Sequence, residues 1–266
     1  MGAPGVHRPA AWAAWAISPD ALALLGTLLA LWWLASHGEW VNRAFLPTPE
    51  ATLASLAAGL GLQGRPGALA GFLLATLQRV LLGGLLAAAA GVGLGALLGS
   101  SAAARVWLQP GLEFLRPLPA SAVIPLAIAV FGLSSSMVLA VVVFGAMWPV
   151  LLATLHGMAS VPRQLNEVAA LLQLGRVAIV IRIALPHALP DIFSGIRLAM
   201  TVALIVSVVG EMVASQPGLG QALLLAARSF RAADLFAGLV LLGATGSAIH
   251  AMLAFAERRL LAWQRP

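Results

Sequence analysis

Long apolar runs alternate along the chain with short stretches that carry charges, prolines and glycines. A helix that crosses a bilayer needs about 20 apolar residues, and six of the runs approach or exceed that length. The pattern therefore predicts an all-α membrane protein with six transmembrane helices, at about residues 21–37, 69–98, 117–131, 137–155, 192–213 and 235–255. Residues 1–20 are predicted to form a cytoplasmic N-terminal segment, and residues 21–266 a single transmembrane domain.

The third apolar run differs from the others because prolines interrupt it. Proline lacks a backbone N–H and clashes with the preceding turn, so this run cannot form an ordinary straight helix. The carbonyl groups that a proline leaves unpaired in a membrane must face other helices, water or a cavity. Pro119 and Pro125 are therefore candidates for the wall of a translocation pathway, and a kinked structural helix is the alternative. The preceding residues 100–116 are predicted to form a short polar link.

Glycines recur at every fourth position of the second run, at Gly91, Gly95 and Gly99. This spacing puts them on one face of a helix, where small residues let a neighbouring helix approach closely. The pattern predicts close helix packing along this face.

Composition supports a membrane protein, with 61% hydrophobic and 9% charged residues and a mean hydropathy of +0.98. Soluble domains average about 25% charged residues. The net charge of +6 does not indicate nucleic-acid binding, because the arginines gather at the ends of apolar runs and form no separate basic patch. The chain has no cysteine, and its five histidines lack the H-E-x-x-H spacing, so no metal site is expected.

The arginines also predict the orientation, since cytoplasmic loops carry an excess of positive charge. Under the six-helix arrangement, the side that holds both termini carries Arg8, Arg105, Arg116, Arg163, Arg176, Arg182, Arg258, Arg259 and Arg265. The other side carries Arg43, Arg65, Arg228 and Arg231. Both termini are therefore predicted to be cytoplasmic.

The same side holds the most polar long interruption, at about residues 160–190. Ser160 suits an N-cap and Pro162 suits the first turn, so a helix is predicted to begin beside them. Gly175 is expected to cap the end of that helix, and Pro186 is expected to end a second short amphipathic helix. The residues predict an exposed helix–turn–helix, and an ordinary loop lying on the membrane surface remains the alternative.

Residues inside this segment resemble a family signature. Glu167 is followed by the alanine pair Ala169 and Ala170, and then by Leu185 and Pro186. This resembles the cytoplasmic signature of the permease subunit of a binding-protein-dependent ABC importer, in particular the nitrate, sulfonate and taurine class. Supporting resemblances cover residues 76–84, 116–132, 185–200, 208–214 and the C-terminal stretch.

The chain departs from that signature at one position. The family has a glycine six residues after the glutamate, where this chain has Gln173. A left-handed turn is costly for glutamine, so the turn lies either at Gln173 or, shifted by two residues, at Gly175.

The resemblance implies a type I importer fold in the bacterial cytoplasmic (inner) membrane. It also implies a second copy of the permease, two cytoplasmic ATPase subunits and an extracytoplasmic solute-binding protein as partners. The coupling segment would dock on the ATPase through Glu167, Val168, Ala169, Ala170, Leu171, Leu172, Gly175 and Pro186. The chain itself would be no enzyme and hold no cofactor. It lacks the G-x-x-x-x-G-K-[ST] motif, so the partner ATPase would bind ATP and Mg²⁺.

Glu211 is an ionisable residue inside the predicted fifth helix, where an unpaired charge is costly. It is a candidate pathway or gate residue, with a structural polar anchor as the alternative. Arg197 precedes it by about 21 Å along a helix and cannot be its partner. His250, inside the sixth helix, is predicted to be a packed or interhelical hydrogen-bonding residue, with a proton-relay role as the alternative.

A stand-alone secondary transporter or a small channel is the other class of function that the residues allow. A secondary transporter would be expected to show paired intramembrane charges or an internal repeat. Neither is visible in the sequence.

Overall fold

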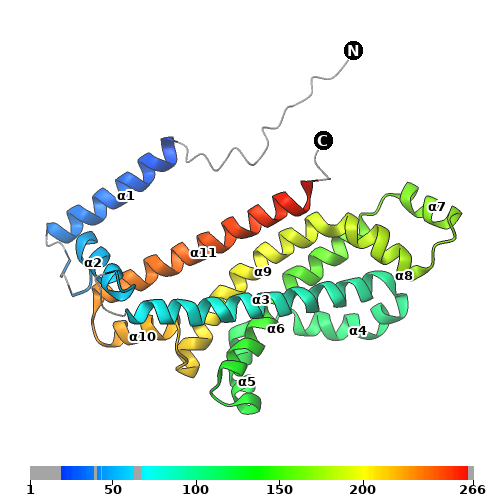
Figure 1. Cartoon of the computed structure of the whole chain (residues 1–266). Helices are drawn as coiled ribbons and strands as arrows, with labels where there is room; N and C mark the ends of the chain where they lie inside the picture. The colour runs from blue at the N-terminus through cyan, green and yellow to red at the C-terminus, as the bar shows by residue number, and fades with distance from the viewer. Residues whose placement is uncertain (1–18, 39–40, 43, 63–66, 263–266) are drawn as a thin grey trace.

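The computed structural model describes residues 19–38, 41–42, 44–62 and 67–262, with only the backbone of Asn166. Most of the predicted N-terminal segment, up to residue 18, lies outside this part of the chain. All regular elements of the described residues are helical (Figure 1). They are α1 (Pro19–His37), α2 (Pro49–Gly59), α3 (Ala68–Ser100), α4 (Ala102–Leu115), the 3₁₀-helix η2 (Ala120–Val123), α5 (Ile124–Phe131), α6 (Ser135–Ala159), α7 (Arg163–Leu171), α8 (Arg176–Ile179), the π-turn η3 (Val180–Ala184), α9 (Leu185–Ala214), α10 (Leu219–Arg228) and α11 (Ala232–Leu260).

Among the described residues, five helical segments are long and apolar enough to cross a membrane. These are Pro19–His37, Ala68–Ser100, Ser135–Ala159, Arg176–Ala214 and Ala232–Leu260. A sixth crossing requires α4 together with the helical residues up to Phe131, which are bent by 100° relative to it. The prediction of an all-α membrane protein is confirmed, with the third predicted helix as the irregular one.

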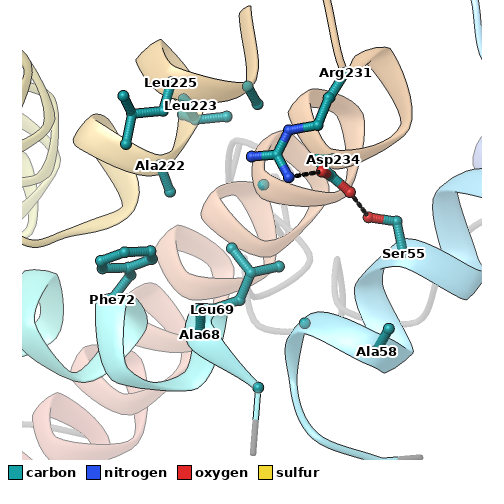
Figure 2. A pocket seen from close by; sticks show the side chains of 14 residues that line it. Ser55, Ala58, Ala68, Leu69, Phe72, Ala222, Leu223, Leu225, Arg231 and Asp234 are labelled. Carbon is teal, nitrogen blue, oxygen red and sulfur yellow. Dashed lines mark hydrogen bonds and ion pairs between the residues drawn. The ribbon is translucent and has the colours of Figure 1, made fainter. Parts of the chain in front are cut away.

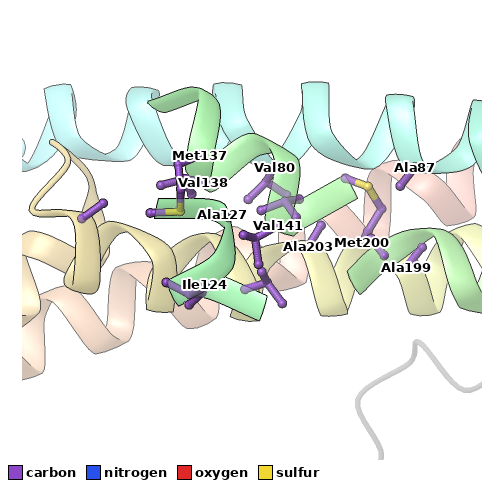
Figure 3. Close-up of a cluster of buried hydrophobic side chains, with 14 of the residues drawn as sticks. Val80, Ala87, Ile124, Ala127, Met137, Val138, Val141, Ala199, Met200 and Ala203 are labelled. Atoms are coloured by element: carbon purple, nitrogen blue, oxygen red, sulfur yellow. The ribbon is translucent and has the colours of Figure 1, made fainter. Parts of the chain in front are cut away.

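The core lies where α3, α6 and α9 pack side by side (Figure 3). Val80 of α3, Val141 of α6 and Ala203 of α9 are each no more than 1% exposed. The outer faces of the same helices are apolar as well, and Leu85 and Ile205 are 68% and 59% exposed. Apolar side chains on both faces are what a bundle surrounded by lipid requires, because the lipid tails replace water as solvent.

Glycines of α3 allow its close approach to α6, as their spacing predicts. A Cβ at Gly91 would lie 2.7 Å from Val150 Cβ, and a Cβ at Gly95 would lie 2.6 Å from Thr154 Cβ. At Gly99 it would lie 3.0 Å from Met158 Sδ. The prediction of close packing along this face is confirmed, because any larger residue would push the two helices apart.

The third predicted span is wrong in its details. Residues 102–115 form α4 where a polar link was expected, since the Ser101 hydroxyl caps the helix by accepting from Ala104 N at 3.2 Å. Beyond Arg116 the prolines break the helix, and only η2 and the eight-residue α5 follow. Gly132 ends α5 with φ +66°. The crossing is therefore a bent pair of helices, because proline cannot continue the hydrogen-bond ladder.

Helix α1 lies beside the bundle and contacts it near its C-terminal end (Figure 1). The Trp32 indole N–H donates to the Pro47 carbonyl at 2.9 Å, and its ring lies 5.7 Å from that of Phe236 in α11. Trp33 donates to the Glu50 carboxylate in the first turn of α2 at 3.1 Å. Backbone N–H donation at that helix start holds the pKa of Glu50 below its ordinary value. These contacts fix the C-terminal end of α1 to α2 and α11.

Replacing Gly95 with leucine should destabilise the bundle, because the new side chain would overlap Thr154 and the Leu151 carbonyl. Overpacking of this kind costs about 1–3 kcal/mol. Gly93→Leu is the matched control, since a Cβ at Gly93 meets nothing within 4 Å. Thermal unfolding of the detergent-solubilised protein measures both, and equal midpoints would contradict the assigned α3–α6 contact.

Candidate functional site

Helix α7 carries the predicted coupling residues from Glu167 to Leu171 and stands off the core at one end of the bundle, here called the α7 end (Figure 1). Glu167 and Ala170 are exposed, and Val168 is 48% exposed. Leu171 and Leu172 are 83% and 66% exposed. Exposed leucines on a polar helix outside the apolar spans form a surface suited to another protein.

The start of α7 differs from the prediction. Ser160 is not its N-cap: its hydroxyl donates to the Gly157 carbonyl at 2.8 Å and so belongs to the end of α6. Pro162 occupies the N-cap position of α7, without a side-chain capping bond. Its ring fixes φ, which suits a residue that precedes a helix and needs no N–H.

The turn after α7 lies at Gln173, not at Gly175. Gln173 has φ +52°, which is the left-handed conformation. Its N–H bonds to the Ala170 carbonyl and that of Leu174 bonds to Ala169, both at 3.0 Å. These are the bonds of a left-handed helix C-cap, in which Ala169 becomes fully buried. The glutamine thus adopts the conformation for which a glycine was expected.

Gly175 lies at the start of α8 and not at the turn after α7. With φ −66° it is in an ordinary extended conformation, and it precedes α8 as the N-cap residue. The expectation that it caps the first helix is wrong, because the chain has already turned two residues earlier. Gly175 and Glu167 are therefore separated by the turn and lie on different helices.

Pro186 does not end the second helix, contrary to the prediction. Residues from Arg176 to Ala214 form one continuous helical segment that includes the π-turn η3. Pro186 lies in the first turn of α9, directly after that π-turn, and Pro190 lies within α9. The wider turn accommodates a residue that cannot donate an N–H, so the helix continues. The predicted fifth span at 192–213 corresponds to the C-terminal part of this longer helix.

Glu211 lies at the opposite end of the bundle, here called the α10 end, and is fully buried. One carboxylate oxygen accepts from Arg79 at 3.0 Å and from Ser207 at 3.2 Å. The other accepts from the Thr76 hydroxyl at 3.0 Å and the Gly220 N–H at 2.9 Å. We call these five residues the Glu211 cluster. It joins α3 and α9 to the first turn of α10, whose free N–H groups favour a negative charge.

Arg79 extends the Glu211 cluster to two further segments. Its guanidinium donates to the Pro217 carbonyl at 2.7 Å and to the Ser135 hydroxyl at 2.9 Å, at the start of α6. Two glycines allow the approach of the loop before α10. A Cβ at Gly218 would lie 2.2 Å from the Glu211 carboxylate carbon, and a Cβ at Gly220 would lie 2.2 Å from the Val208 carbonyl oxygen. This geometry is that of a structural anchor, which holds α10 and its loop against the bundle.

Sequence reasoning missed Arg79 as the partner of Glu211. Arg79 lies inside the predicted second helix, at residues 69–98. Two intramembrane charges of opposite sign on different helices are nevertheless a signal for pairing. Arg197 pairs instead with Glu257 of α11. His250 of α11 lies 2.9 Å from the Thr201 hydroxyl of α9, which confirms the predicted interhelical hydrogen bond.

A cavity of about 300 Å³ adjoins the α10 end, between α2, α3, α10 and α11 (Figure 2). Asp234 accepts a hydrogen bond from Ser55 and pairs with Arg231 at 3.0 Å. These contacts hold α2 against the start of α11. Among the described residues, no group of three or more histidine, aspartate or glutamate side chains could hold a metal ion.

The structure separates the predicted site residues into three places. The coupling residues lie at the α7 end and Glu211 at the α10 end (Figure 1). Pro119 precedes η2 and Pro125 lies in the first turn of α5, and both are exposed at the bend of the third crossing. The continuous helix of residues 176–214 connects the first two places.

Comparison with known proteins gives one consistent result. The family described as binding-protein-dependent transport system inner membrane component matches residues 91–261. A putative aliphatic sulfonates transport permease protein of Bacillus subtilis (strain 168) is 32% identical over 243 residues, covering 91% of this chain and 87% of the relative. The taurine transport system permease protein of Escherichia coli (strain K12) is 30% identical over 254 residues, covering 94% and 92%. A nitrate import permease protein of Leptolyngbya laminosa is 30% identical over 154 residues, covering 58% and 55%.

Gln173→Gly should stabilise the protein by about 1 kcal/mol, because glycine adopts a left-handed conformation without the cost that other residues incur. Gly175→Ala is the matched comparison. It should cause no loss, since Gly175 has φ −66° and a Cβ there meets nothing within 4 Å. Denaturation midpoints of the two variants decide the position of the turn: a loss at Gly175 with no gain at Gln173 would contradict it.

Glu211→Leu should destabilise the protein by about 3–5 kcal/mol, because it leaves the Arg79 guanidinium without its carboxylate partner in a buried place. The double variant Arg79→Leu with Glu211→Leu should recover much of the loss, since no unpaired charge remains. Glu113→Gln, an exposed residue, is the control. Thermal unfolding of the unmodified protein and the three variants tests this, and a double variant no more stable than Glu211→Leu would refute the pairing.

Proposed function

The chain belongs to the family of binding-protein-dependent transport system inner membrane components, and from this premise we propose how it works as the permease of an ATP-driven importer. Its relatives by sequence are permease subunits of such importers, which supports this function over a stand-alone secondary transporter or channel. It is a multi-pass protein of the inner membrane. The partners, the coupling residues and the substrate below are our proposals.

The observation that carries the coupling mechanism is the exposed apolar surface of α7. Leu171 and Leu172 are among the most exposed large hydrophobic residues at this end, although burying each would be favourable by about 1.5–3 kcal/mol. Glu167 lies beside them on the same short helix. A groove of a cytoplasmic ATPase subunit that receives these side chains would cover them. ATP and Mg²⁺ would bind to that subunit, because this chain lacks a phosphate-binding glycine loop.

The movement of α7 would reach the opposite side of the membrane through the helical segment of residues 176–214. At 1.5 Å per residue this segment is about 58 Å long, which exceeds the thickness of a bilayer. The Glu211 cluster ties its far end to α3, α6 and α10. A displacement at α7 would therefore shift the α10 end as a unit, because the buried hydrogen bonds resist local distortion.

The translocation path would form between two copies of the chain, at the face that carries the bend of the third crossing. Pro119 and Pro125 are exposed there, and so are the apolar residues Leu126 and Val130, at 66% and 67%. A second permease would cover this surface. An extracytoplasmic solute-binding protein would deliver the solute at the α10 end. Closure of the ATPase dimer would then turn the pair from inward-facing to outward-facing.

The substrate is proposed to be a small anion or organic acid. Relatives are named for the transport of aliphatic sulfonates, taurine and nitrate, which share a compact oxyanion or sulfonate group. The solute-binding protein would select among such solutes. Identification of the ligand that copurifies with that protein would determine the substrate.

Leu171→Asp should abolish coupling, since it places a charge in the surface that docks on the ATPase, while the permease itself should remain folded because Leu171 is 83% exposed. ATP hydrolysis in the reconstituted complex should lose its stimulation by loaded binding protein, and Glu167→Arg should act in the same direction. Leu171→Met is the matched control, because it keeps an apolar side chain of similar size. Full stimulation in both charge variants would refute the docking surface.

A further inference from the structure

Helices α7 and α8 form an arm that is joined to the bundle at two points (Figure 1). We call residues 163–179, which comprise α7, α8 and the turn between them, the coupling arm. At its N-terminal end, the non-helical residues Val161 and Pro162 connect the arm to α6. At its C-terminal end, the π-turn η3 connects α8 to α9. The arm therefore has a short non-helical linker on one side and an irregular helical turn on the other.

The packing of the long helix changes at η3. No residue of α8 is buried, and Val177 is 71% exposed. From Ala188 onward, α9 lies tightly against α6, because Ala188 is fully buried and a Cβ added at Gly157 of α6 would lie 2.6 Å from its Cβ. The continuous helix of residues 176–214 thus has a free first part and a fixed second part, with η3 between them.

The backbone at this boundary is suited to bending. Sharp kinks in helices occur at π-turns and at prolines, and Pro186 lies two residues after η3, in the first turn of α9. Pro186 has no backbone N–H, so the turn before it lacks one of the hydrogen bonds that would resist bending. Hinge motions of proteins are absorbed by a few residues at the ends of such elements. The boundary between α8 and α9 therefore has the geometry of a hinge.

A cavity of about 440 Å³ lies beside this boundary. It separates α8 and η3 from the C-terminal ends of α3 and α6 and from the start of α4. Its wall on the side of the bundle consists mainly of small residues, namely Gly99, Ser100, Ala102 and Ala159, together with Met158 and Val161. The small residues leave room for α8 to approach the bundle when the helix bends at η3.

Arg176 is the charged residue of the cavity lining. It begins α8, is exposed, and makes no hydrogen bond or ion pair with another described residue. Across the cavity, α3 ends at Ser100 and α6 ends at Ala159, and the free carbonyl groups of a helix C-terminus attract positive charge. Arg105 already donates to the Leu98 carbonyl at the end of α3, at 3.1 Å. Approach of Arg176 to these helix ends would therefore favour closure of the cavity.

We propose that η3 and Pro186 form a hinge about which the coupling arm moves between two positions. The open position is that of the structure, in which the cavity separates α8 from the bundle. In the closed position, α8 lies against the ends of α3 and α6, and Arg176 reaches their carbonyl groups. The role of this movement in transport rests on the proposed function: the arm would swing first, and α9 from Ala188 onward would move as a unit once the cavity is closed.

Distances between spin labels on the purified full-length chain in lipid nanodiscs test the hinge. The chain has no cysteine, so the labels attach only at introduced cysteines. Val177→Cys on α8 and Leu85→Cys on α3, both exposed, form the α8–α3 pair. Double electron–electron resonance should show two distance populations for this pair, with the shorter one from the closed arm. The core pair, Leu85→Cys with Ile205→Cys, should show one narrow population, because α3 and α9 are packed together.

Three variants should change the distances of the α8–α3 pair in different ways. Arg176→Glu should lower the ratio of closed to open arms about three- to thirtyfold, because helix C-termini repel a negative charge. Ser100→Trp should remove the shorter distance, since the larger side chain occupies the cavity. Pro186→Ala should reduce the two populations to one, because the restored N–H can donate a hydrogen bond that resists bending.

Two matched controls should leave both populations unchanged. Arg163→Glu reverses a charge of the same arm that does not line the cavity, and Pro190→Ala removes a proline from the packed part of α9. Size-exclusion chromatography shows whether each variant is folded, and the exposed Arg176 keeps the test decisive if Pro186→Ala is unstable. An α8–α3 distribution as narrow as that of the core pair, or one that Arg176→Glu leaves unchanged, would overturn the proposal.

The hinge and the docking surface on α7 are tested separately, because neither the ATPase nor the binding protein is present in the distance measurement. ATPase stimulation that persists in Leu171→Asp would refute the docking surface and leave the measured distances unaffected. A single narrow distance for the α8–α3 pair would overturn the hinge, whereas loss of stimulation in Leu171→Asp would still support the docking surface.

Discussion

The buried carboxylate of Glu211 is the interaction on which the arrangement of the helices at the α10 end depends. A charge inside an apolar bundle is stable only when it is paired and fully hydrogen-bonded. The bonds to Thr76, Arg79, Ser207 and Gly220 meet this requirement. The position of α10 and its loop follows from that constraint, as does the presence of glycine at position 218.

Close packing of small residues connects this end to the rest of the protein. In lipid, helices gain little from burying apolar surface against each other, so contact distance decides how well they associate. Gly91 and Gly95 of α3 bring α6 near, and Gly195 of α9 does the same, because a Cβ added there would lie 2.6 Å from Ala153 Cβ. The three helices therefore behave as one unit. The long helix that ends in the Glu211 cluster begins beside α7, which makes this unit suitable for carrying movement across a membrane.

The two ends of the bundle differ in how complete they are within one chain. At the α10 end the polar groups of the Glu211 cluster are paired, and the glycines of the adjoining turn are in place. The α7 end leaves Leu171 and Leu172 exposed. An exposed apolar surface of this kind is suited to contact with another protein. This contrast agrees with a permease that works as one component of a larger importer.

The sequence by itself determined the features that depend on neighbouring residues. The apolar runs predicted an all-α membrane protein, the glycine spacing predicted the α3–α6 contact, and the prolines predicted that the third crossing is not a straight helix. Signature residues around Glu167 indicated the family. Hydrophobicity, backbone restriction and helical spacing are local properties, so they can be read along the chain.

Only the tertiary structure decided the features that depend on distant residues. Arg79 and Glu211 are 132 positions apart, and no local pattern selects that pairing over others. The sequence does not decide whether the turn after α7 lies at Gln173 or at Gly175. The left-handed conformation of Gln173 depends on the helices on both sides, which outweigh the conformational preference of glutamine. The π-turn before Pro186 and the contact of α4 with α3 are likewise not indicated by the residues near them in the sequence. The summed free energy of the long-range contacts determines these features, because it exceeds the small free-energy differences of local conformational preference.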